Sequence, residues 1–260
     1  MLSIVVPAYN EEKRIEPMLE SYGSFFLEKE KSEGLKTEIF VVINNTTDNT
    51  VKIVQKFAKK YSNIKYMDIK PGGKGFATTI GFKDALHKGS ELIGFVDADM
   101  ATKPESYYDL YKNMGNYHGV IASRWMKGSI VNARTSGKYI RSRSFNYLVR
   151  GLFLFPYKDT QCGAKLFRKE VIEKVVNHIE IPEWAFDVNI LYLCKVNNFR
   201  IKEIPTVWDD KEGSTIDAIQ VPLRMGGGVI RLRLLNSWFG FIIEAYDKLL
   251  AKRLKMHNLI

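Results

Sequence analysis

The sequence of 260 residues contains only two cysteines and four scattered histidines. Cys162 and Cys194 are too few for a disulfide scaffold, and the low count is typical of a reducing compartment. The histidines lack the spacing of a zinc site. The longest stretch without Asp, Glu, Lys or Arg, residues 113–123, has eleven residues, whereas a transmembrane helix needs roughly 20. The N-terminus has no basic leader or cleavage site, so we expect a first strand there and a protein that faces the cytosol.

The remaining composition is that of a globular protein with a strongly basic charge. Apolar residues make up 45% of the chain and charged residues 26%, which excludes disordered, collagen-like and coiled-coil proteins. The formal net charge of +10 favours an anionic partner, such as a nucleotide or a phospholipid surface. We expect no nucleic-acid partner, because the basic residues are scattered and form no recognised binding motif.

Apolar runs of strand length alternate with segments of helical period in the first half of the chain. The runs are Ser3–Pro7, Glu38–Ile43, Ile64–Ile69, Leu92–Val96 and His118–Ser123. Helices are expected after Asp48 and over Lys74–His87 and Pro104–Met114. This alternation predicts an α/β fold with a mostly parallel sheet flanked by helices, in which ligands bind at the carboxyl ends of the strands.

The pattern changes after about residue 138. We expect helices over Tyr139–Leu154, Lys169–Val176 and Trp184–Val196, and strands at the end of Asp159–Phe167 and over Arg200–Trp208. Residues 225–255 have an apolar stripe and many cations, which indicates one or two amphipathic helices. The predicted division is therefore a main α/β domain at residues 1–224 and an amphipathic helical tail at residues 225–260.

Asp97 and Asp99 follow the apolar run Leu92–Val96 directly. Side chains two residues apart on a strand point to the same side, so both carboxylates should face one point. Carboxylates this close repel each other unless a cation lies between them, and a divalent ion shared with substrate phosphates is the usual solution. The alternative is a solvated turn at a strand end, where aspartate is also common.

Three further polar clusters follow expected strands or open expected helices. Asn10 and Glu11 open a predicted helix after the first strand, polar residues follow the second, and two glycines precede Lys74. Backbone N–H groups at such positions can meet an anion, and glycine allows a ligand to approach closely. Each cluster alone is also explained as an ordinary cap or turn, but together they indicate a binding site.

These motifs resemble the inverting glycosyltransferases of family 2, which have the GT-A (Rossmann-like) fold. VVPAYNEE is similar to the first nucleotide-binding strand of that family, Asp97-Ala98-Asp99 to its DxD metal motif, and Ala122-Ser123-Arg124 to its G-S-R segment. DADMATK and DTQCGAKLF are more narrowly similar to the polyprenyl-phosphate sugar synthases, and among them to the dolichyl-phosphate β-glucosyltransferases. The likeness extends through FDVNILYL and EGST, and so covers about residues 3–215.

The resemblance implies a nucleotide-sugar site formed by Pro7, Tyr9, Asn10, Glu11, Asn44, Lys74, Asp97, Ala98 and Asp99. Where the family usually has two aspartates, this chain has Ile43 and Asn44. An amide offers both donors and an acceptor, which suits the edge of uracil, so we favour UDP. GDP-mannose is the alternative donor.

The resemblance also implies that a hexose, with glucose favoured, is transferred with inversion to dolichyl or another polyprenyl phosphate. Mg²⁺ or Mn²⁺ on Asp97 and Asp99 would neutralise the leaving diphosphate. Arg124, Arg141 and Arg143 are candidates to clamp the acceptor phosphate, although the last two also suit a solvated helix face. Asp187 is expected to position the acceptor or hold an arginine, or else to be a helix-surface acid.

Two rival functions remain open. A family 2 enzyme with a glycan hydroxyl acceptor would need a carboxylate base, for which Asp187 or Glu183 could serve. A non-catalytic nucleotide-binding protein is disfavoured by the intact acidic pair together with Lys74 and Arg124.

The lipid acceptor implies peripheral contact with the cytoplasmic face of a membrane. Residues 144–156 and the tail combine apolar side chains with arginines, as interfacial helices do. Both segments can equally well pack on the domain itself or on another subunit. Cys162 is expected to be a packed residue rather than a nucleophile, because nothing nearby in the sequence supplies a paired base.

Overall fold

The computed structural model describes residues 1–70, 72–132, 136–179, 185–209, 220–235 and 237. The strands are β1 (Leu2–Ala8), β2 (Thr37–Asn44), β3 (Ile64–Ile69), β4 (Leu92–Val96), β5 (Gly119–Ser123), β6 (Ile130–Asn132), β7 (Ala164–Arg168), β8 (Ile201–Pro205) and β9 (Val207–Asp209). The helices are α1 (Ile15–Glu33), α2 (Thr50–Lys60), α3 (Lys74–His87), α4 (Pro104–Lys112), α5 (Ser136–Phe153), α6 (Lys169–Val175), α7 (Phe186–Val196) and α8 (Gln220–Leu235), with a 3₁₀ turn at Val176–His178.

Seven strands form one sheet in the order β3-β2-β1-β4-β7-β5-β8, and β6 pairs with β9 in a small second sheet. Every strand pair of the large sheet is parallel except those of β7, which runs antiparallel to both β4 and β5. Every residue of β1 is buried, as expected for a strand rich in Val and Ile at the centre of a sheet covered on both faces.

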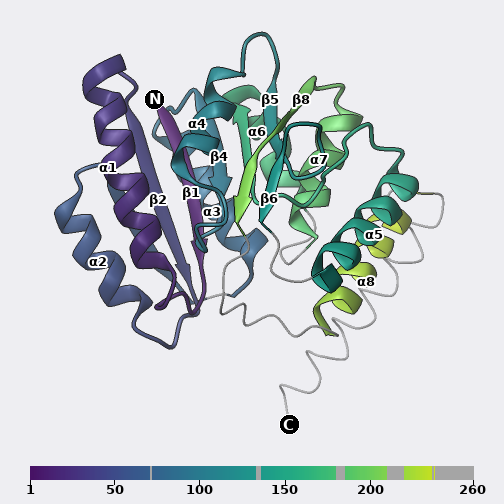
Figure 1. The fold of residues 1–260 in the computed structure, drawn as a ribbon, viewed down its shortest axis with the longest axis horizontal. Helices are drawn as coiled ribbons and strands as arrows, with labels where there is room; N and C mark the ends of the chain where they lie inside the picture. The colour runs from purple at the N-terminus through teal and green to yellow at the C-terminus, as the bar shows by residue number, and fades with distance from the viewer. Residues whose placement is uncertain (71, 133–135, 180–184, 210–219, 236, 238–260) are drawn as a thin grey trace. The chain divides into compact units, whose positions relative to one another are not determined.

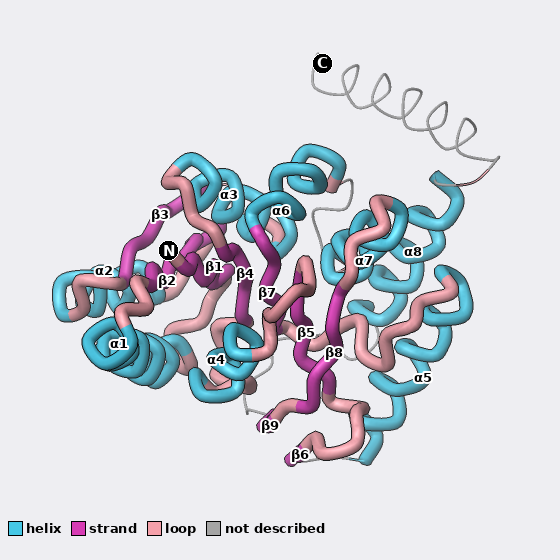
Figure 2. The backbone as a smooth tube through the Cα atoms, turned by 90° about the horizontal axis from the view of Figure 1, so that it is seen from above, coloured by secondary structure: helices cyan, strands magenta, loops and turns pink. Residues whose placement is uncertain are grey.

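Helices cover both faces of the large sheet. Figure 2 shows α1 and α4 on one face and α3 and α6 on the other, and the ribbon of Figure 1 shows α1 lying along β2. Helix α3 approaches β1 closely at Gly81, where a Cβ would lie 2.4 Å from Val5 Cγ1. This close approach brings the first residue of α3, Lys74, to the edge of the sheet at which β1 ends.

The carboxyl ends of β1, β2, β4 and β5 lie at one edge of the sheet. Because β7 is antiparallel, its first residue, Ala164, lies opposite the last residue of β4, Val96. The segment that precedes β7 therefore reaches the same edge as the residues that follow β4. The segments after β1 and β4 and the segment before β7 carry the motifs that resemble family 2. They therefore lie at the same edge of the sheet, although they are far apart in the sequence.

Two sequence expectations need correction. The strand predicted over Arg200–Trp208 is two strands, β8 and β9, in different sheets, because Pro205 ends β8 and cannot donate a backbone hydrogen bond. Asn10 and Glu11 do not open the first helix, which begins at Ile15; Asn10 has a φ of 51°, a left-handed conformation that a helix cannot contain.

Residues 1–215 and residues 216–260 form two separate compact units. In the second unit the structure describes α8, in which Val229 and Leu232 are buried and Ile230 is exposed. The predicted boundary after residue 224 lies within α8, and most of the predicted tail lies outside the described residues. No helix in the described part of the chain has both the length and the hydropathy of a membrane span.

Candidate active site

The loops after β1 and β2 are locked together by side chains that accept backbone hydrogen bonds. Asp48 Oδ2 accepts from the Glu12 amide at 3.1 Å, and Asn10 Oδ1 accepts from the Thr47 amide at 2.9 Å. Thr50 Oγ1 accepts from the Glu11 amide at 2.9 Å. This network fixes the backbone after β1, where the sequence predicted part of a nucleotide site.

The other predicted residues of this segment lie in different surroundings. Pro7 is buried within β1, and Tyr9 is half exposed at the end of the strand. Glu11 forms a bidentate ion pair with Arg14, with both contacts at 2.7 Å. Burial raises the pKa of Glu11 to about 7, although the Arg14 charge opposes the shift. Glu11 therefore places a carboxylate with a near-neutral pKa beside the acidic pair.

Asn44 does not face an open nucleotide site. Its side chain is buried, and with the amide oriented to satisfy its partners, Nδ2 donates to the Ala8 carbonyl at 2.9 Å and Oδ1 accepts from the Gly73 amide at 3.1 Å. The amide thus ties the end of β1 to the loop before α3. The amide groups that were predicted to bind a uracil edge are instead hydrogen-bonded to the protein backbone.

Asp97 and Asp99 leave β4 as predicted, and the segment before β7 supports them. The Asp97 amide donates to the Gly163 carbonyl at 3.1 Å. A Cβ at residue 163 would lie 1.8 Å from Asp97 Oδ2, so only glycine leaves room for this carboxylate. Ala98, between the two aspartates, is buried.

The acidic pair has the chemistry of a divalent-cation site that is completed by a ligand. Burial, and next the charge of Asp97, raises the pKa of Asp99, which reports two carboxylates in repulsion. Among the described residues, no cluster of three or more His, Cys, Asp and Glu side chains gathers to hold a metal. Two carboxylates with the remaining positions left to substrate phosphates are a frequent Mg²⁺ site, so the donor set fits.

Lys74 lies between two acids. Its Nζ is 2.7 Å from Asp97 Oδ1 and 3.2 Å from Asp187 Oδ2. Asp187, at the start of α7, receives a second ammonium, because Lys165 Nζ is 2.5 Å from its Oδ1. Burial alone would raise the pKa of Asp187, but the charges of Lys165 and Lys74 hold it below its usual value. Asp187 is therefore neither a surface acid nor the partner of an arginine.

Arg124 is paired with a buried acid, Asp159, which was not among the residues predicted from the sequence. Its Nε and Nη2 donate to the two carboxylate oxygens of Asp159 at 2.7 and 3.0 Å. Asp159 has no exposed surface and also accepts from the Arg124 amide at 3.0 Å. The guanidinium carbon lies 5.4 Å from the ring centre of Trp125 and 5.3 Å from that of Trp208. Arg124 is held rigidly, and Asp159 balances its charge.

Helix α5, the loop after it and the segment after β5 form a basic, aromatic hollow of about 170 Å³. The residues that line it are Trp125, Arg143, Asn146, Tyr147, Arg150 and Lys158. The Arg143 guanidinium carbon lies 5.4 Å from the Trp125 ring centre. Trp125 therefore contacts both Arg143 and Arg124. Arg141 belongs to the same helix, but its side chain lies outside the described residues, as does Glu183.

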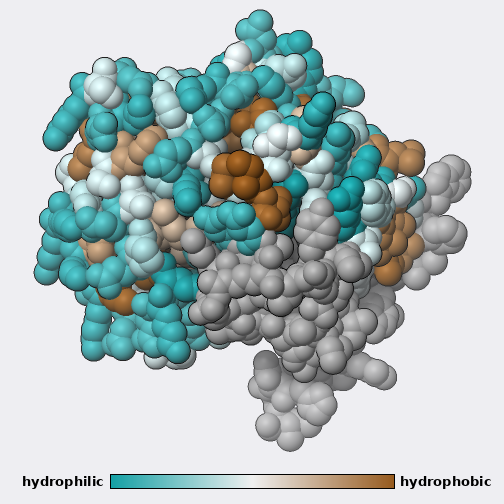
Figure 3. All heavy atoms as spheres, in the orientation of Figure 1, coloured by the Kyte–Doolittle hydropathy of each residue, from teal (hydrophilic) through white to brown (hydrophobic). Residues whose placement is uncertain are grey.

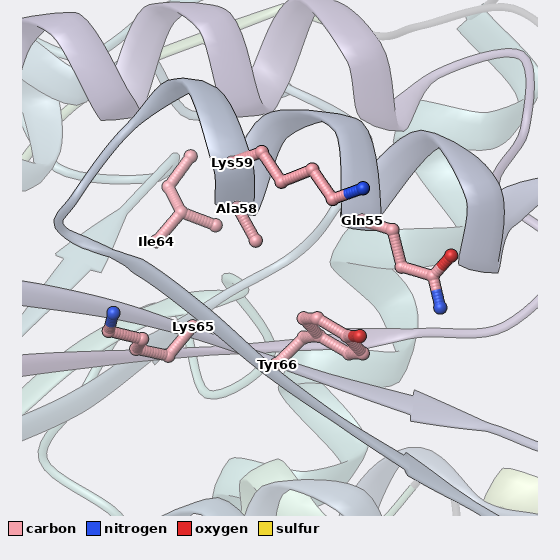
Figure 4. Close-up of a pocket in the computed structure, with 6 residues that line it drawn as sticks. All are labelled: Gln55, Ala58, Lys59, Ile64, Lys65 and Tyr66. Atoms are coloured by element: carbon pink, nitrogen blue, oxygen red, sulfur yellow. The ribbon is translucent and has the colours of Figure 1, made fainter.

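A larger hollow of about 520 Å³ lies elsewhere, between α2 and the beginning of β3 (Figure 4). Its lining residues are Gln55, Ala58, Lys59, Ile64, Lys65 and Tyr66. Gln55, Ala58 and Lys59 belong to α2 and the other three residues to the start of β3, whereas the acidic pair follows the carboxyl end of β4. We assign no function to this hollow.

Several residues of the site were not singled out from the sequence. Asp159, Gly163 and Lys165 all lie in DTQCGAKLF, which was used only as a family marker. A signal was present for one of them, because a lysine inside the apolar strand AKLF is unusual unless it has a buried acidic partner. Arg150 and Lys158 carried no comparable signal.

A mostly parallel sheet with an acidic pair after a central strand is the architecture of GT-A glycosyltransferases. A solved glucosyl-3-phosphoglycerate synthase from Mycobacterium tuberculosis, in complex with Mn²⁺, UDP and glucosyl-3-phosphoglycerate, has this fold. It superposes with a TM-score of 0.66 over 90% of this chain and 78% of its own, at 16% identity. The predicted GT-A fold is confirmed.

The particular family follows from the sequence matches. The model of glycosyl transferase family 2 matches residues 3–176, and the chain belongs to that family. It is 32% identical to a dolichyl-phosphate beta-glucosyltransferase of Dictyostelium discoideum, over 91% of this chain and 76% of the relative. The Homo sapiens protein of the same name is 31% identical over 90% and 75%, respectively. The predicted resemblance and the assignment as a glycosyltransferase are confirmed.

Proposed function

We propose that the protein transfers glucose from UDP-glucose to dolichyl or another polyprenyl phosphate, with inversion at the sugar carbon. Relatives named for this acceptor and this sugar match about nine-tenths of the chain. The observation that carries the proposal is the pairing of Asp187. Both of its oxygens are engaged by lysines, at 2.5 Å by Lys165 and at 3.2 Å by Lys74. A carboxylate held in this way is a poor general base, which disfavours a hydroxyl acceptor.

A phosphate acceptor suits such a site. Its second pKa is about 6, so it is already an anion near neutral pH and needs no base. Its difficulty is repulsion from the donor diphosphate. Two unit charges 4 Å apart cost about 4 kcal/mol at an effective dielectric constant of about 20. Cations on the acceptor side must offset this repulsion.

The hollow along α5 is the proposed acceptor site. Three cationic side chains line it, those of Arg143, Arg150 and Lys158, together with two aromatic rings. Arg150 Nε is buried and has no hydrogen-bond partner among the described residues, as expected of a donor kept for a ligand. The guanidinium fork matches the geometry of a phosphate. Arg124, with its charge balanced by Asp159, would serve here by orienting Trp125 rather than as a free cation.

Asp97 and Asp99 are the proposed ligands of Mg²⁺ or Mn²⁺, and when bound the ion supplies positive charge to the leaving diphosphate. Lys74 would contribute a second positive charge on the same side. The M. tuberculosis enzyme of the same fold was crystallised with Mn²⁺ and UDP, which supports a divalent ion and a uridine nucleotide. Asn44 no longer supports UDP, because its amide is committed to the backbone.

A transfer assay tests the donor, the acceptor and the metal together. We expect label from UDP-glucose to appear in dolichyl phosphate with Mg²⁺ or Mn²⁺ and to disappear with EDTA. Preferred transfer from GDP-mannose would show that the proposed donor, UDP-glucose, is wrong. Transfer to glycan hydroxyls but not to the lipid phosphate would show that the proposed acceptor is wrong.

Substitution of Arg150 tests the acceptor site. Arg150→Gln should raise the KM for dolichyl phosphate about tenfold and leave UDP affinity within about twofold, since one charge-assisted phosphate contact contributes roughly 1.5 kcal/mol or more. Arg200→Gln is the matched control, because Arg200 does not line the hollow and its Nη2 donates to the Asn116 carbonyl, at 2.9 Å. Equal losses of acceptor and UDP affinity in the Arg150 variant would contradict this site.

We also propose that the enzyme works on the cytoplasmic face of a membrane. Helix α5 exposes Tyr147, which lines the basic hollow, and Leu148, and Leu154 directly after the helix is also exposed. Exposed apolar side chains on a basic helix suit the membrane interface. Figure 3 shows a largely hydrophilic surface on which hydrophobic residues form several small, separate patches. Sedimentation with anionic liposomes should weaken when Leu148 and Leu154 are both changed to Ser; undiminished sedimentation would overturn this role of α5.

A further inference from the structure

Lys165 is a fully buried lysine and the second residue of β7. Its ammonium donates to the Cys162 carbonyl at 2.7 Å and to Asp187 Oδ1 at 2.5 Å. A buried ammonium is costly unless an acid and further hydrogen bonds satisfy it. Asp187 therefore supplies the negative charge that offsets the cost of burying the Lys165 ammonium.

Four charged groups of alternating sign run from the core to the acidic pair. Lys165 contacts Asp187, Asp187 Oδ2 lies 3.2 Å from Lys74 Nζ, and Lys74 Nζ lies 2.7 Å from Asp97 Oδ1. The ring of Phe95 borders both ammonium groups, with its centre 5.5 Å from Lys74 Nζ and 5.3 Å from Lys165 Nζ. Low-dielectric surroundings of this kind strengthen interactions between the four groups.

Packed aromatic rings fix the position of Asp187. The preceding residue, Phe186, is buried, and its ring centre lies 5.5 Å from that of Phe95 and 6.1 Å from that of Phe82. Phe82 belongs to α3, the helix that Lys74 begins, and Phe95 belongs to β4, the strand that Asp97 follows. The carboxylate of Asp187 is thus held in one place relative to both of these elements.

Lys165 decides how much positive charge Lys74 can offer. A lone pair of Asp187 with Lys74 would be neutral, and Lys74 would then attract an anion weakly. Because Lys165 shares the Asp187 carboxylate, the group of three keeps one net positive charge beside the acidic pair. Asp187 can in this way hold the Lys74 ammonium without cancelling it.

We propose that Lys165 and Asp187 are positioning residues, which together hold the Lys74 ammonium toward the diphosphate of the sugar donor. The inference rests on the proposed function only in naming the diphosphate as the anion. Neither residue contacts the donor; both act through Lys74. The proposal predicts that loss of the pair disturbs Lys74 even when the fold is intact.

The test uses Lys165→Met and the double variant Lys165→Met/Asp187→Asn. The single variant leaves Asp187 without its buried partner and should lower stability, whereas the double variant removes both charges and should recover it. Lys195→Met is the matched control, because within the described residues Lys195 Nζ donates only to the carbonyls of Phe153 and Leu154, at 2.7 and 2.8 Å. Urea unfolding measures the stability of each protein.

Two readouts separate positioning from a purely structural role. UDP affinity with Mg²⁺, measured by calorimetry, should fall at least tenfold in both Lys165 variants and less than twofold in Lys195→Met. The rate at which acetic anhydride labels Lys74, measured by mass spectrometry, should rise severalfold in the double variant. A double variant that regains stability together with wild-type UDP affinity and Lys74 labelling overturns the proposal.

The same measurements distinguish failure of this inference from failure of the proposed function. If the wild-type protein binds GDP instead of UDP, the proposed donor is wrong, and the variants are compared with GDP. If it binds neither, the proposed function fails, and the labelling of Lys74 still decides the inference: a faster rate in the double variant supports it and an unchanged rate overturns it.

Discussion

Gly163→Ala should disable the acidic pair while leaving the fold intact. The added Cβ would lie 1.8 Å from Asp97 Oδ2 and 2.3 Å from its Cγ. The neighbouring strands β4 and β7 are fully paired, so the backbone cannot easily move away. The carboxylate must therefore turn out of its place between Gly163 and Lys74.

The size of the effect follows from this distance. Restoring a contact of 3.0 Å requires Asp97 Oδ2 to move by about 1.2 Å, and turning the carboxylate by this much also displaces Oδ1, which lies 2.7 Å from Lys74 Nζ. Misplacing a group at a reaction centre by about 1 Å can cost on the order of 100-fold in rate. We expect a decrease of about 100-fold in kcat/KM for sugar transfer. The penalty in stability should be smaller, roughly 1–3 kcal/mol, as for other overpacked sites.

The assay compares Gly163→Ala with Gly151→Ala. Gly151 lies in α5, where an added Cβ meets nothing within 4 Å, so this control adds the same methyl group without a clash. Helix propensity predicts that the control gains about 0.5–1 kcal/mol in stability and keeps its activity. Activity of Gly163→Ala within threefold of the wild type would refute the argument that this glycine makes room for Asp97.

Two further predictions concern stability and pH. Asp159→Asn should lower the free energy of unfolding by about 3–5 kcal/mol at neutral pH, since the Arg124 guanidinium loses its buried partner; urea unfolding measures it. Arg124 holds the pKa of Asp159 below its usual value against the effect of burial, so the difference from the wild type should shrink as pH falls below about 4. For Glu11→Gln, the stability difference from the wild type should depend on pH in the opposite direction. Burial raises the folded-state pKa of Glu11 from 4.5 to about 7, so the wild type loses stability relative to the variant as pH rises through this range. A pH-independent difference in either comparison contradicts the assigned ion pair or burial.

Much of the fold could be predicted from local sequence patterns. The apolar runs that become β1, β2 and β4 are continuous because both faces of a central parallel strand are buried. Asp97 and Asp99 could be placed at the carboxyl edge of the sheet because they directly follow such a run. The split of the last predicted strand at Pro205 was missed, since a single proline does not reveal that the chain continues into a second sheet.

The roles of several charged and polar side chains could not be predicted from the sequence. Asn44 has the donors and acceptor of a base-reading residue, and the same groups bind Ala8 and Gly73 once three loops meet. Asp187 has the character of a base until Lys165, on another element, is placed against it. Arg124 has the character of a free phosphate clamp until Asp159 is found beneath it.

The sequence alone therefore determined the α/β architecture, the family and the position of the acidic pair. Only the tertiary structure decided which cationic side chains are paired with a buried carboxylate and which are available to bind a ligand. The physical reason is one of range: periodicity and strand endings are written in neighbouring residues, whereas the charge that a side chain offers depends on partners within about 3 Å, and these partners come from distant parts of the chain.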